Sequence, residues 1–280
     1  MGYNFLVFRV KSGHLEITEF DQYECRGDNA VRILQLAIAA APDSFEGRSG
    51  CVSFTDWPPD ASLLQSFDLV FSSTKHFGEH SPFLPFPCPY SLGWPQIGVP
   101  DGNGLLISFL SSPPAPESPK AFWIGANMHH SRATLRETAQ SFPELFDVEL
   151  MEWNRDNPEV RLQSQSRYVH LSDHRRYKYL IDCQGGGYSG RLRWLIASGR
   201  PVFVVQRREV EFWHDFMVPW KHYIPVREDL GDLLENHGII EENPGLYGEI
   251  AMHAQEFAGE NLVLEKMIKH VVDGVRSLGH

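Results

Sequence analysis

A chain of 280 residues is long enough for two domains of ordinary size, and 42% hydrophobic with 12% aromatic residues is typical of a globular protein rather than a disordered one. The formal net charge of −11 argues against a partner such as nucleic acid or an anionic membrane surface. The four cysteines are widely spaced with no CxxC pair, which indicates reduced thiols rather than a disulfide or metal framework.

The first residues of the sequence predict no signal peptide. Residues 1–6 lack a basic region followed by an apolar core and a cleavage site, so no signal peptide is expected. The longest apolar helical stretch, 33–41, is too short to cross a bilayer. We therefore expect a soluble, cytoplasmic protein with no membrane span.

Patterns in the first part of the chain predict alternating helices and strands. Regular apolar spacing predicts a helix over 29–41, with Asn29 as its N-terminal cap. The β-prone runs 51–54 and 69–71 predict short strands. Prolines between 81 and 100 predict a long ordered loop.

A second proline-rich segment, 111–119, is the expected linker between two α/β halves. We assign residues 1–117 to an amino-terminal domain and residues 118–262 to a carboxy-terminal domain that opens with a strand at 121–124. Residues 263–280 carry apolar side chains at helical spacing and predict a final amphipathic helix.

The stretch from Tyr177 to Leu195 is the most informative part of the sequence. A β-prone run, 177–182, is followed by a glycine-rich turn and then by an expected helix that opens with Arg191 and Arg193. Glycine lets the backbone approach a ligand closely, and a helix N-terminus attracts anions. Arginines there are unfavourable unless an anion binds. The pattern predicts a phosphate-binding turn.

Basic residues gather around this turn. Nine of the 25 lysines and arginines lie between residues 167 and 208, against only Asp173 and Asp182. In an acidic chain such a window favours a compact anion such as a nucleotide diphosphate. A solvated basic surface is the alternative interpretation.

One enzyme class consistent with the turn is an NADP-dependent oxidoreductase. Gly185, Gly187 and Gly190 follow the G-x-G-x-x-G spacing of a dinucleotide fold. Arg207 and Arg208, after the next strand-like run, could hold the 2′-phosphate of NADP. The sequence offers no Tyr-x-x-x-Lys proton donor with a partner serine, which weighs against this class.

A longer set of residues resembles glycosyltransferase family 90. The set comprises Asp173-His174, the run 177–182, the turn 187–191, Gly199, His222–Val226 and Asp229-Leu230. The resemblance implies an α/β protein of the GT-B fold, with two Rossmann-like domains facing across a cleft. It also implies an inverting, metal-independent transfer of a sugar from a UDP-sugar to a hydroxyl, with no cofactor.

The resemblance assigns a role to Asp56, which follows a short strand and precedes Trp57 and a proline. This is the setting of the catalytic base in the family. Arg132 keeps the family's spacing from Gly125 and matches the position that contacts the donor phosphates, although Ile124 replaces the usual first arginine.

Within the glycine turn, Gly187, Ser189, Gly190 and Arg191 match donor-binding positions of the family. Gly190 stands where the protein O-glucosyltransferases of the family carry phenylalanine, which opens the turn and favours a different acceptor.

The expected substrates are UDP-xylose, preferred to UDP-glucose, and a glycan acceptor on which Trp57 and Trp94 stack. The His129-His130 pair has no carboxylate or cysteine at ligand spacing, so no metal site is expected. A glycan-binding protein that kept the fold and lost the chemistry is the non-enzyme alternative, and the presence of Asp56 argues against it.

Overall fold

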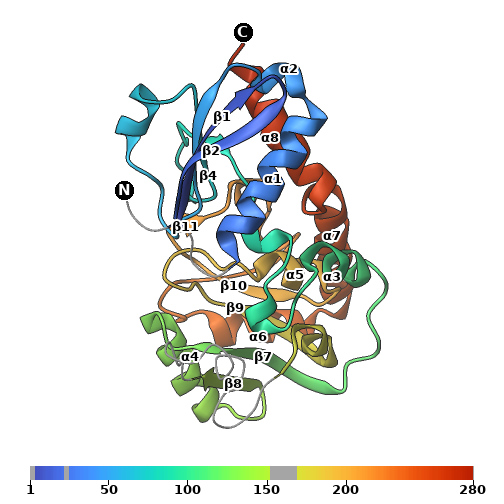
Figure 1. Cartoon of the computed structure of the whole chain (residues 1–280). Coiled ribbons are helices and arrows are strands. Elements are labelled where there is room, and N and C mark those ends of the chain that lie inside the picture. The colour runs from blue at the N-terminus through green and yellow to red at the C-terminus, as the bar shows by residue number, and fades with distance from the viewer. Residues whose placement is uncertain (1–3, 22–24, 152–168, 280) are drawn as a thin grey trace. The chain divides into compact units, whose positions relative to one another are not determined.

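The chain forms two α/β units, each built on a five-stranded sheet (Figure 1). The computed structural model describes residues 4–21, 25–151 and 169–279, so Arg167 of the basic window lies outside the described residues. The first unit comprises Met1–Gly93, Arg208–Asp215 and Val263–His280, and the second comprises Trp94–Arg207 and Phe216–Leu262. The expected α/β fold class is confirmed.

The first unit has a mixed sheet in the order β2-β1-β3-β4-β6, in which β1 is antiparallel to β2 and β3 while β3, β4 and β6 are parallel. The strands are β1 (Phe5–Lys11), β2 (His14–Asp21), β3 (Ser49–Ser53), β4 (Leu69–Ser72) and β6 (Leu84–Pro85), with a small separate pair of β5 (Lys75–His76) and β11 (Glu209–Val210). The helices are α1 (Arg26–Ala40), α2 (Pro42–Phe45) and α8 (Leu264–Ser277), with 3-10 turns η1 (Ala61–Gln65), η2 (Pro89–Ser91) and η6 (Phe212–Phe216).

The core of this unit joins the two ends of the chain. In Figure 1 helix α8 lies beside α1. The buried residues of α1 recur at helical spacing and pack with one face of α8. They are Ala30, Ile33, Leu34, Ala37 and Ile38 of α1 and Ile268, Val271, Val272 and Val275 of α8. The expected carboxy-terminal helix is therefore confirmed, and it is an integral part of the first unit.

Helix α1 begins earlier than expected. Its first residue is Arg26 and its cap position is Cys25, so the expected capping role of Asn29 is wrong. Asn29 is buried inside the helix, and its Nδ2 donates a hydrogen bond to the Gly93 carbonyl at 3.0 Å. The side chain thereby fixes the loop that ends this part of the unit instead of the helix terminus.

The hairpin of β1 and β2 was not predicted. Its turn is formed by Ser12 and Gly13, both with positive φ. The amide nitrogens of these residues donate to the two Glu46 carboxylate oxygens at 2.7 and 2.8 Å. These backbone hydrogen bonds lower the pKa of Glu46, with the Gly13 amide contributing most.

The second unit has an all-parallel sheet in the order β12-β10-β9-β7-β8. Its strands are β7 (Ser118–Ala126), β8 (Phe146–Met151), β9 (Tyr177–Asp182), β10 (Val202–Val205) and β12 (Ile224–Val226). The helices are α3 (Gly102–Phe109), α4 (His130–Ser141), α5 (Leu192–Ala197), α6 (Leu233–Glu242) and α7 (Pro244–Asn261), with 3-10 turns η3 (Pro95–Ile97) and η5 (Leu171–Arg176).

The strand order of this sheet defines where a ligand is expected. Starting at β7, the chain first adds β8 on one side and then returns to add β9, β10 and β12 on the other. The order therefore reverses between β7 and β9. In open α/β sheets the crevice at the carboxyl ends of the strands on either side of such a reversal is the usual ligand site.

The division between the units differs from the expected domain boundary at residue 117. Residues 94–117 belong to the second unit. Trp194 Nε1 donates to the Gly102 carbonyl of α3 at 2.7 Å. The Ser111 carbonyl accepts a hydrogen bond from Arg175 at 2.8 Å, and Pro114 accepts one from Arg200. Arginine donors hold the proline-rich segment against its own unit, so it is not a linker.

Gly199 shows where this unit requires a glycine. It follows the carboxyl end of α5 with a φ of +71°, a left-handed conformation that disfavours side chains. A Cβ there would also lie 2.8 Å from both the Gln255 side chain and Pro113. Any larger residue would therefore strain the turn between α5 and β10.

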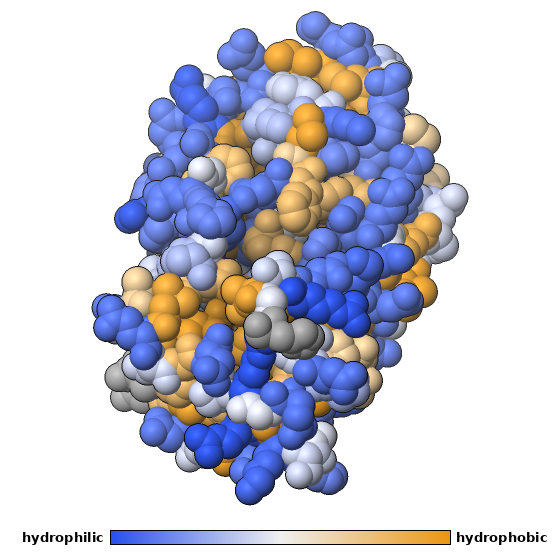
Figure 2. Space-filling view, turned by 90° about the horizontal axis from the view of Figure 1, so that it is seen from above, coloured by the Kyte–Doolittle hydropathy of each residue, from blue (hydrophilic) through white to orange (hydrophobic). Residues whose placement is uncertain are grey.

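Among the described helices, none combines the length and the apolar composition needed to cross a bilayer. Hydrophilic residues cover much of the face drawn in Figure 2, with exposed apolar residues between them.

Candidate functional site

The carboxyl ends of β7 and β9 carry a group of buried charges in the second unit. We call Arg132, Arg191, Arg207 and Asp182 the arginine cluster. Each of the three arginines is at most partly exposed, and Asp182 is fully buried. The cluster lies at the reversal of strand order, where the topology places a ligand.

Asp182 is the last residue of β9 and the centre of the cluster. Arg207 Nη1 lies 2.6 Å from its Oδ2, and Arg191 Nε lies 3.6 Å from its Oδ1. The Ser189 hydroxyl donates to Oδ1 at 2.7 Å. Arg207 Nη2 also donates to the Asp182 carbonyl at 3.0 Å. The carboxylate thus connects the turn after β9 to the loop after β10.

Arg132 connects this group to the end of β7. It lies in the first turn of α4, and its guanidinium donates to the carbonyls of Ala126 and Gln184, both at 2.6 Å, and of Cys183 at 3.3 Å. Burial lowers the pKa of Arg132 to about 10, with a further contribution from the nearby Arg191 charge. The side chain is therefore still protonated at neutral pH.

Arg191 has the least satisfied guanidinium of the cluster. Its Nη1 donates to the Ile124 carbonyl of β7. Its Nη2 is buried and has no hydrogen-bond partner among the described residues. Burial lowers the pKa of Arg191, and the opposing charge of Asp182 counteracts that shift. A buried donor without an acceptor suits a site that a ligand completes.

The Trp123 side chain of β7 lies beside two of these charges. The guanidinium carbons of Arg132 and Arg191 each lie 5.2 Å from its centroid. Cation–π attraction of this kind favours two like-charged groups near one aromatic ring. The indole therefore helps to keep two arginines close together.

Charge in the cluster is unbalanced. Three guanidiniums face one carboxylate, which leaves two positive charges in excess among these four side chains. Burial raises the pKa of the adjacent Cys183 thiol to about 12, so it carries no compensating charge. Burial, together with the Arg191 charge, lowers the pKa of His174 to about 3, so that ring adds none either. The arrangement is suited to bind a dianionic group.

The glycine turn joins β9 to α5 and includes Gly187 and Gly190, but it differs from the expected phosphate site in two ways. Helix α5 has only six residues, so its dipole adds little. Arg193 does not join the cluster, because it is fully buried and donates to the Leu262 carbonyl. The expectation that both opening arginines face the ligand is therefore wrong for Arg193.

The two other matched residues, Ser189 and Arg132, use their side chains to hold the protein together. Ser189 donates to Asp182, and Arg132 donates to three carbonyls. Their hydrogen bonds fix the shape of the site. Among the three matched residues with polar side chains, Arg191 has a donor, Nη2, without an acceptor among the described residues.

Asp56 lies in the first unit, just after β3. Arg26 Nη1 of α1 lies 3.1 Å from its Oδ1 and 3.3 Å from the Phe54 carbonyl. The Arg26 guanidinium also lies 4.8 Å from the centre of the Tyr90 ring. Sequence reasoning missed Arg26, because the predicted helix began three residues later and left it in a loop.

The two tryptophans expected at the acceptor belong to different units. Trp57, next to Asp56, is 57% exposed, which leaves its ring open for stacking. Trp94 lies in the second unit at the start of η3 and is half-buried, and its backbone pairs with that of Val99. Trp57 therefore offers the more accessible surface.

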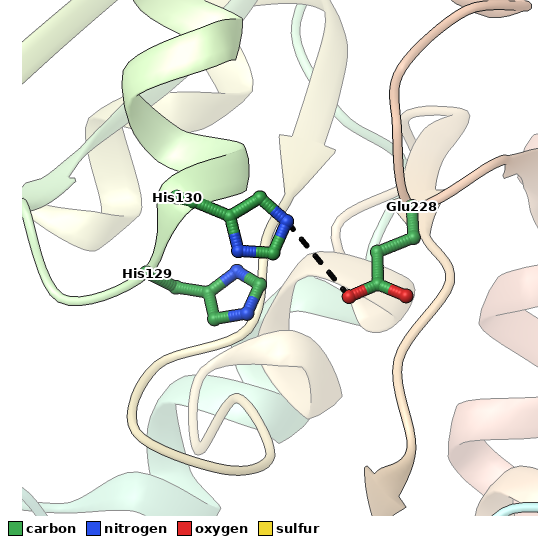
Figure 3. Close-up of side chains that lie close together, drawn as sticks. All are labelled: His129, His130 and Glu228. Carbon is green, nitrogen blue, oxygen red and sulfur yellow. Dashed lines mark ion pairs between the residues drawn. The ribbon is translucent and has the colours of Figure 1, made fainter.

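The histidine pair has a carboxylate partner after all, contrary to the sequence expectation. Figure 3 shows His129 and His130, at the start of α4, with the Glu228 carboxylate turned toward them from the loop after β12. His130 Nε2 lies 3.9 Å from Glu228 Oε1. Burial and the neighbouring His130 lower the pKa of His129. The partner comes from a distant part of the sequence, so local spacing could not find it.

The family model described as Glycosyl transferase family 90 matches residues 113–273, more than half of the chain. Protein O-glucosyltransferase 1 of Rattus norvegicus is 28% identical over 228 residues, which are 76% of this chain and 57% of that protein. The O-glucosyltransferase rumi homolog of Aedes aegypti is 32% identical over 152 residues, 51% of this chain and 37% of that protein.

The chain thus spans about 57% of the length of protein O-glucosyltransferase 1. Among solved structures, the GtfA/B complex is 17% identical with a TM-score of 0.36, covering 60% of this chain and 38% of that one. Anabaena Alr3699/HepE in complex with UDP is 12% identical with a TM-score of 0.35, covering 66% of this chain and 46% of that one.

The role of Asp182 at the centre of the cluster can be tested by measuring the free energy of unfolding of a variant. Asp182→Asn leaves buried guanidiniums without their counter-charge, so the free energy of unfolding should fall by about 3–5 kcal/mol. Urea denaturation followed by circular dichroism measures this loss. Glu117→Gln, which removes an exposed partner of Arg176 in the same unit, is the matched control and should change little. Equal effects of the two variants would contradict the assignment.

Proposed function

The chain belongs to glycosyl transferase family 90, and on that basis we propose that it transfers a sugar from a UDP-sugar to a hydroxyl of an acceptor. The observation that carries the proposal is the arginine cluster at the reversal of strand order in the all-parallel sheet, inside the matched region. The proposal assigns the donor site to the second unit and the base to the first.

The proposed donor site is the arginine cluster. A UDP-sugar carries a diphosphate, whose negative charge complements the two excess positive charges. Arg191 is the proposed direct contact, because its Nη2 has no other acceptor among the described residues. Negative charge on the diphosphate grows as the bond to the sugar breaks. Fixed guanidiniums stabilise that charge in the transition state more than in the bound substrate.

The proposed general base is Asp56. In an inverting displacement the acceptor oxygen attacks C1 of the sugar from the face opposite the diphosphate, C1–O to the diphosphate breaks, and the base takes the acceptor proton. The ion pair with Arg26 engages Oδ1 of Asp56, which orients the carboxylate so that Oδ2 can accept that proton. Arg26 would then be a positioning residue.

The proposed sugar is glucose. The similar proteins are named O-glucosyltransferases, which favours glucose over the xylose preferred from the sequence. The acceptor we propose is a glycan hydroxyl, and the support for it is the exposed Trp57 ring beside Asp56, a flat apolar surface on which a sugar can stack.

The oxidoreductase alternative lacks support in the structure. The Arg207 side chain that would bind the 2′-phosphate of NADP is buried and paired with Asp182. Gly185 does not adopt a left-handed φ, and a Cβ there would make only ordinary contacts at 3.5 Å or more. We therefore keep the sugar transferase as the single proposal.

The base is tested by Asp56→Asn, which preserves shape and removes the proton acceptor. Turnover should fall by roughly two to four orders of magnitude while the affinity for UDP stays unchanged. Transfer from UDP-glucose measured as UDP release, together with UDP calorimetry, separates the two quantities. Asp28→Asn on the exposed surface of α1 is the control. Native turnover in Asp56→Asn would place the base elsewhere.

The donor site is tested by Arg191→Ala. Losing charge-assisted hydrogen bonds to the diphosphate should weaken UDP binding about tenfold to a hundredfold and also slow transfer. Arg191→Lys, which keeps the charge, should bind UDP with intermediate affinity. Arg136→Ala removes an exposed arginine of the neighbouring α4 and should leave UDP affinity unchanged. If Arg191→Ala binds UDP as the native protein does, the cluster is not the donor site.

Transfer should not require a divalent cation, because arginines supply the positive charge at the diphosphate. Activity assayed after exhaustive dialysis against EDTA should stay within about twofold of the untreated enzyme, a margin that allows for weak charge screening. Abolition by chelation with recovery on adding Mn²⁺ would contradict this part of the proposal.

A further inference from the structure

Three metal-ligating side chains from two distant segments meet at the carboxyl edge of the second sheet (Figure 3). His129 and His130 follow β7 and open α4, and Glu228 follows β12 at the far side of the same sheet. One ligand atom from each residue lies within 4.8 Å of the others. The reaction proposed above uses none of the three.

The distances suit a small cation after a modest adjustment. Ligand bonds of about 2.0–2.1 Å in a tetrahedral zinc site place ligand atoms about 3.3 Å apart. His130 Nε2 and Glu228 Oε1 lie 3.9 Å apart, so they need to approach by less than 1 Å. Both side chains are more than half exposed, at 68% and 56%, and can rotate without disturbing the core.

Ser131 supplies the support that a histidine ligand needs. The Ser131 amide donates to His129 Nδ1 at 3.3 Å as the cap of α4, and the Ser131 hydroxyl lies 2.9 Å from the same ring nitrogen. Ser131 itself is 1% exposed, so its hydroxyl is held in place. To bind a metal through Nε2, His129 must carry its proton on Nδ1; the Ser131 hydroxyl then accepts that proton's hydrogen bond, and the cap hydrogen bond from the Ser131 amide is lost. Metal-binding histidines characteristically donate their other ring N–H in this way.

An ion pair alone explains the cluster less well. The rings of His129 and His130 lie 4.0 Å apart, so protonating both to pair with Glu228 places two positive charges together. Arg132 and Arg207 add further positive potential at His129. An exposed histidine–carboxylate pair also contributes little stability. A divalent metal instead binds both rings in their neutral form and takes the Glu228 carboxylate as a third ligand.

We propose that His129, His130 and Glu228 form a binding site for a divalent transition metal of the zinc class. Two imidazoles and one carboxylate select such ions over Mg²⁺ or Ca²⁺, which prefer all-oxygen sites. Three protein ligands leave the fourth tetrahedral position open to water. The nearby arginines lower the affinity below that of a closed structural site. Bound metal connects the loop after β7 to the loop after β12.

The site is tested by titrating the metal-free native protein with Co²⁺ and following visible absorption, then displacing Co²⁺ with Zn²⁺. We expect one Co²⁺ per chain with the absorption of a four-coordinate ion, displacement by equimolar Zn²⁺, and no displacement by millimolar Mg²⁺. His130→Ala and Glu228→Gln should each weaken binding at least tenfold, and Ser131→Ala about tenfold. His80→Ala, another exposed histidine, is the matched control and should bind as the native protein does.

The readout does not depend on catalysis. Circular dichroism and the melting temperature in EDTA should match the native values for His130→Ala and Glu228→Gln, because both side chains are exposed. Absence of stoichiometric Co²⁺ binding to the native protein would overturn the proposal. Binding that persists unchanged in both variants would overturn it equally. EDTA-resistant transfer, expected above, is compatible with this site because the diphosphate is held by arginines.

Discussion

The contact between the Asp182 carboxylate and the arginines around it is the interaction on which the rest of the site depends. Asp182 ends a central strand, so its position is fixed by a sheet whose strands are buried. From there it holds Arg207 from the loop after β10 and Ser189 and Arg191 from the turn after β9. Arg132 donates to the carbonyls of Ala126 and Cys183 and so links the end of β7 to the end of β9.

The cluster has more positive than negative charge. Burying a guanidinium costs free energy unless it is paired, and one carboxylate cannot neutralise three. Arg191 Nη2 has no acceptor among the described residues, and the proposed diphosphate would supply one. A site built in this way is preorganised, since the charges are in place before the ligand arrives. The large apolar core around the sheet offsets the free-energy cost of burying these charges.

Parts of the fold could be predicted because they depend on local pattern. The core face of α1, the strand after the first helix pair and the final helix each follow from apolar spacing, and the strand before the glycine turn follows from its β-prone run. A family resemblance predicts that Arg132, Ser189 and Arg191 bind the donor, and the structure brings these three residues to one place. Whether they bind the donor is what the Arg191 variants test.

The remainder depends on contacts between distant segments. No local pattern identifies Asp182 as the centre of the cluster. Its ion-pair partner Arg207 lies after the next strand, and the sequence alone suggests an NADP contact for that arginine. Arg26 at the start of α1 pairs with Asp56 after β3, thirty residues along the chain. Glu228 lies near the two histidines because β12 and β7 belong to the same parallel sheet. The segment 111–119 has the composition of a linker, yet arginine donors bind its carbonyls and keep it within the second unit. Such hydrogen bonds leave no sequence pattern.

The place where the diphosphate of UDP binds is the most direct test of the arginine cluster. Arginine side-chain NMR of ¹⁵N-labelled protein, titrated with UDP, reports on each guanidinium separately. If the cluster holds the diphosphate, the Arg191 Nε and Nη resonances shift and exchange more slowly as UDP binds, whereas the resonances of Arg193, which is buried at the Leu262 carbonyl, do not change. UDP binding that leaves the Arg191, Arg132 and Arg207 resonances unchanged would contradict it.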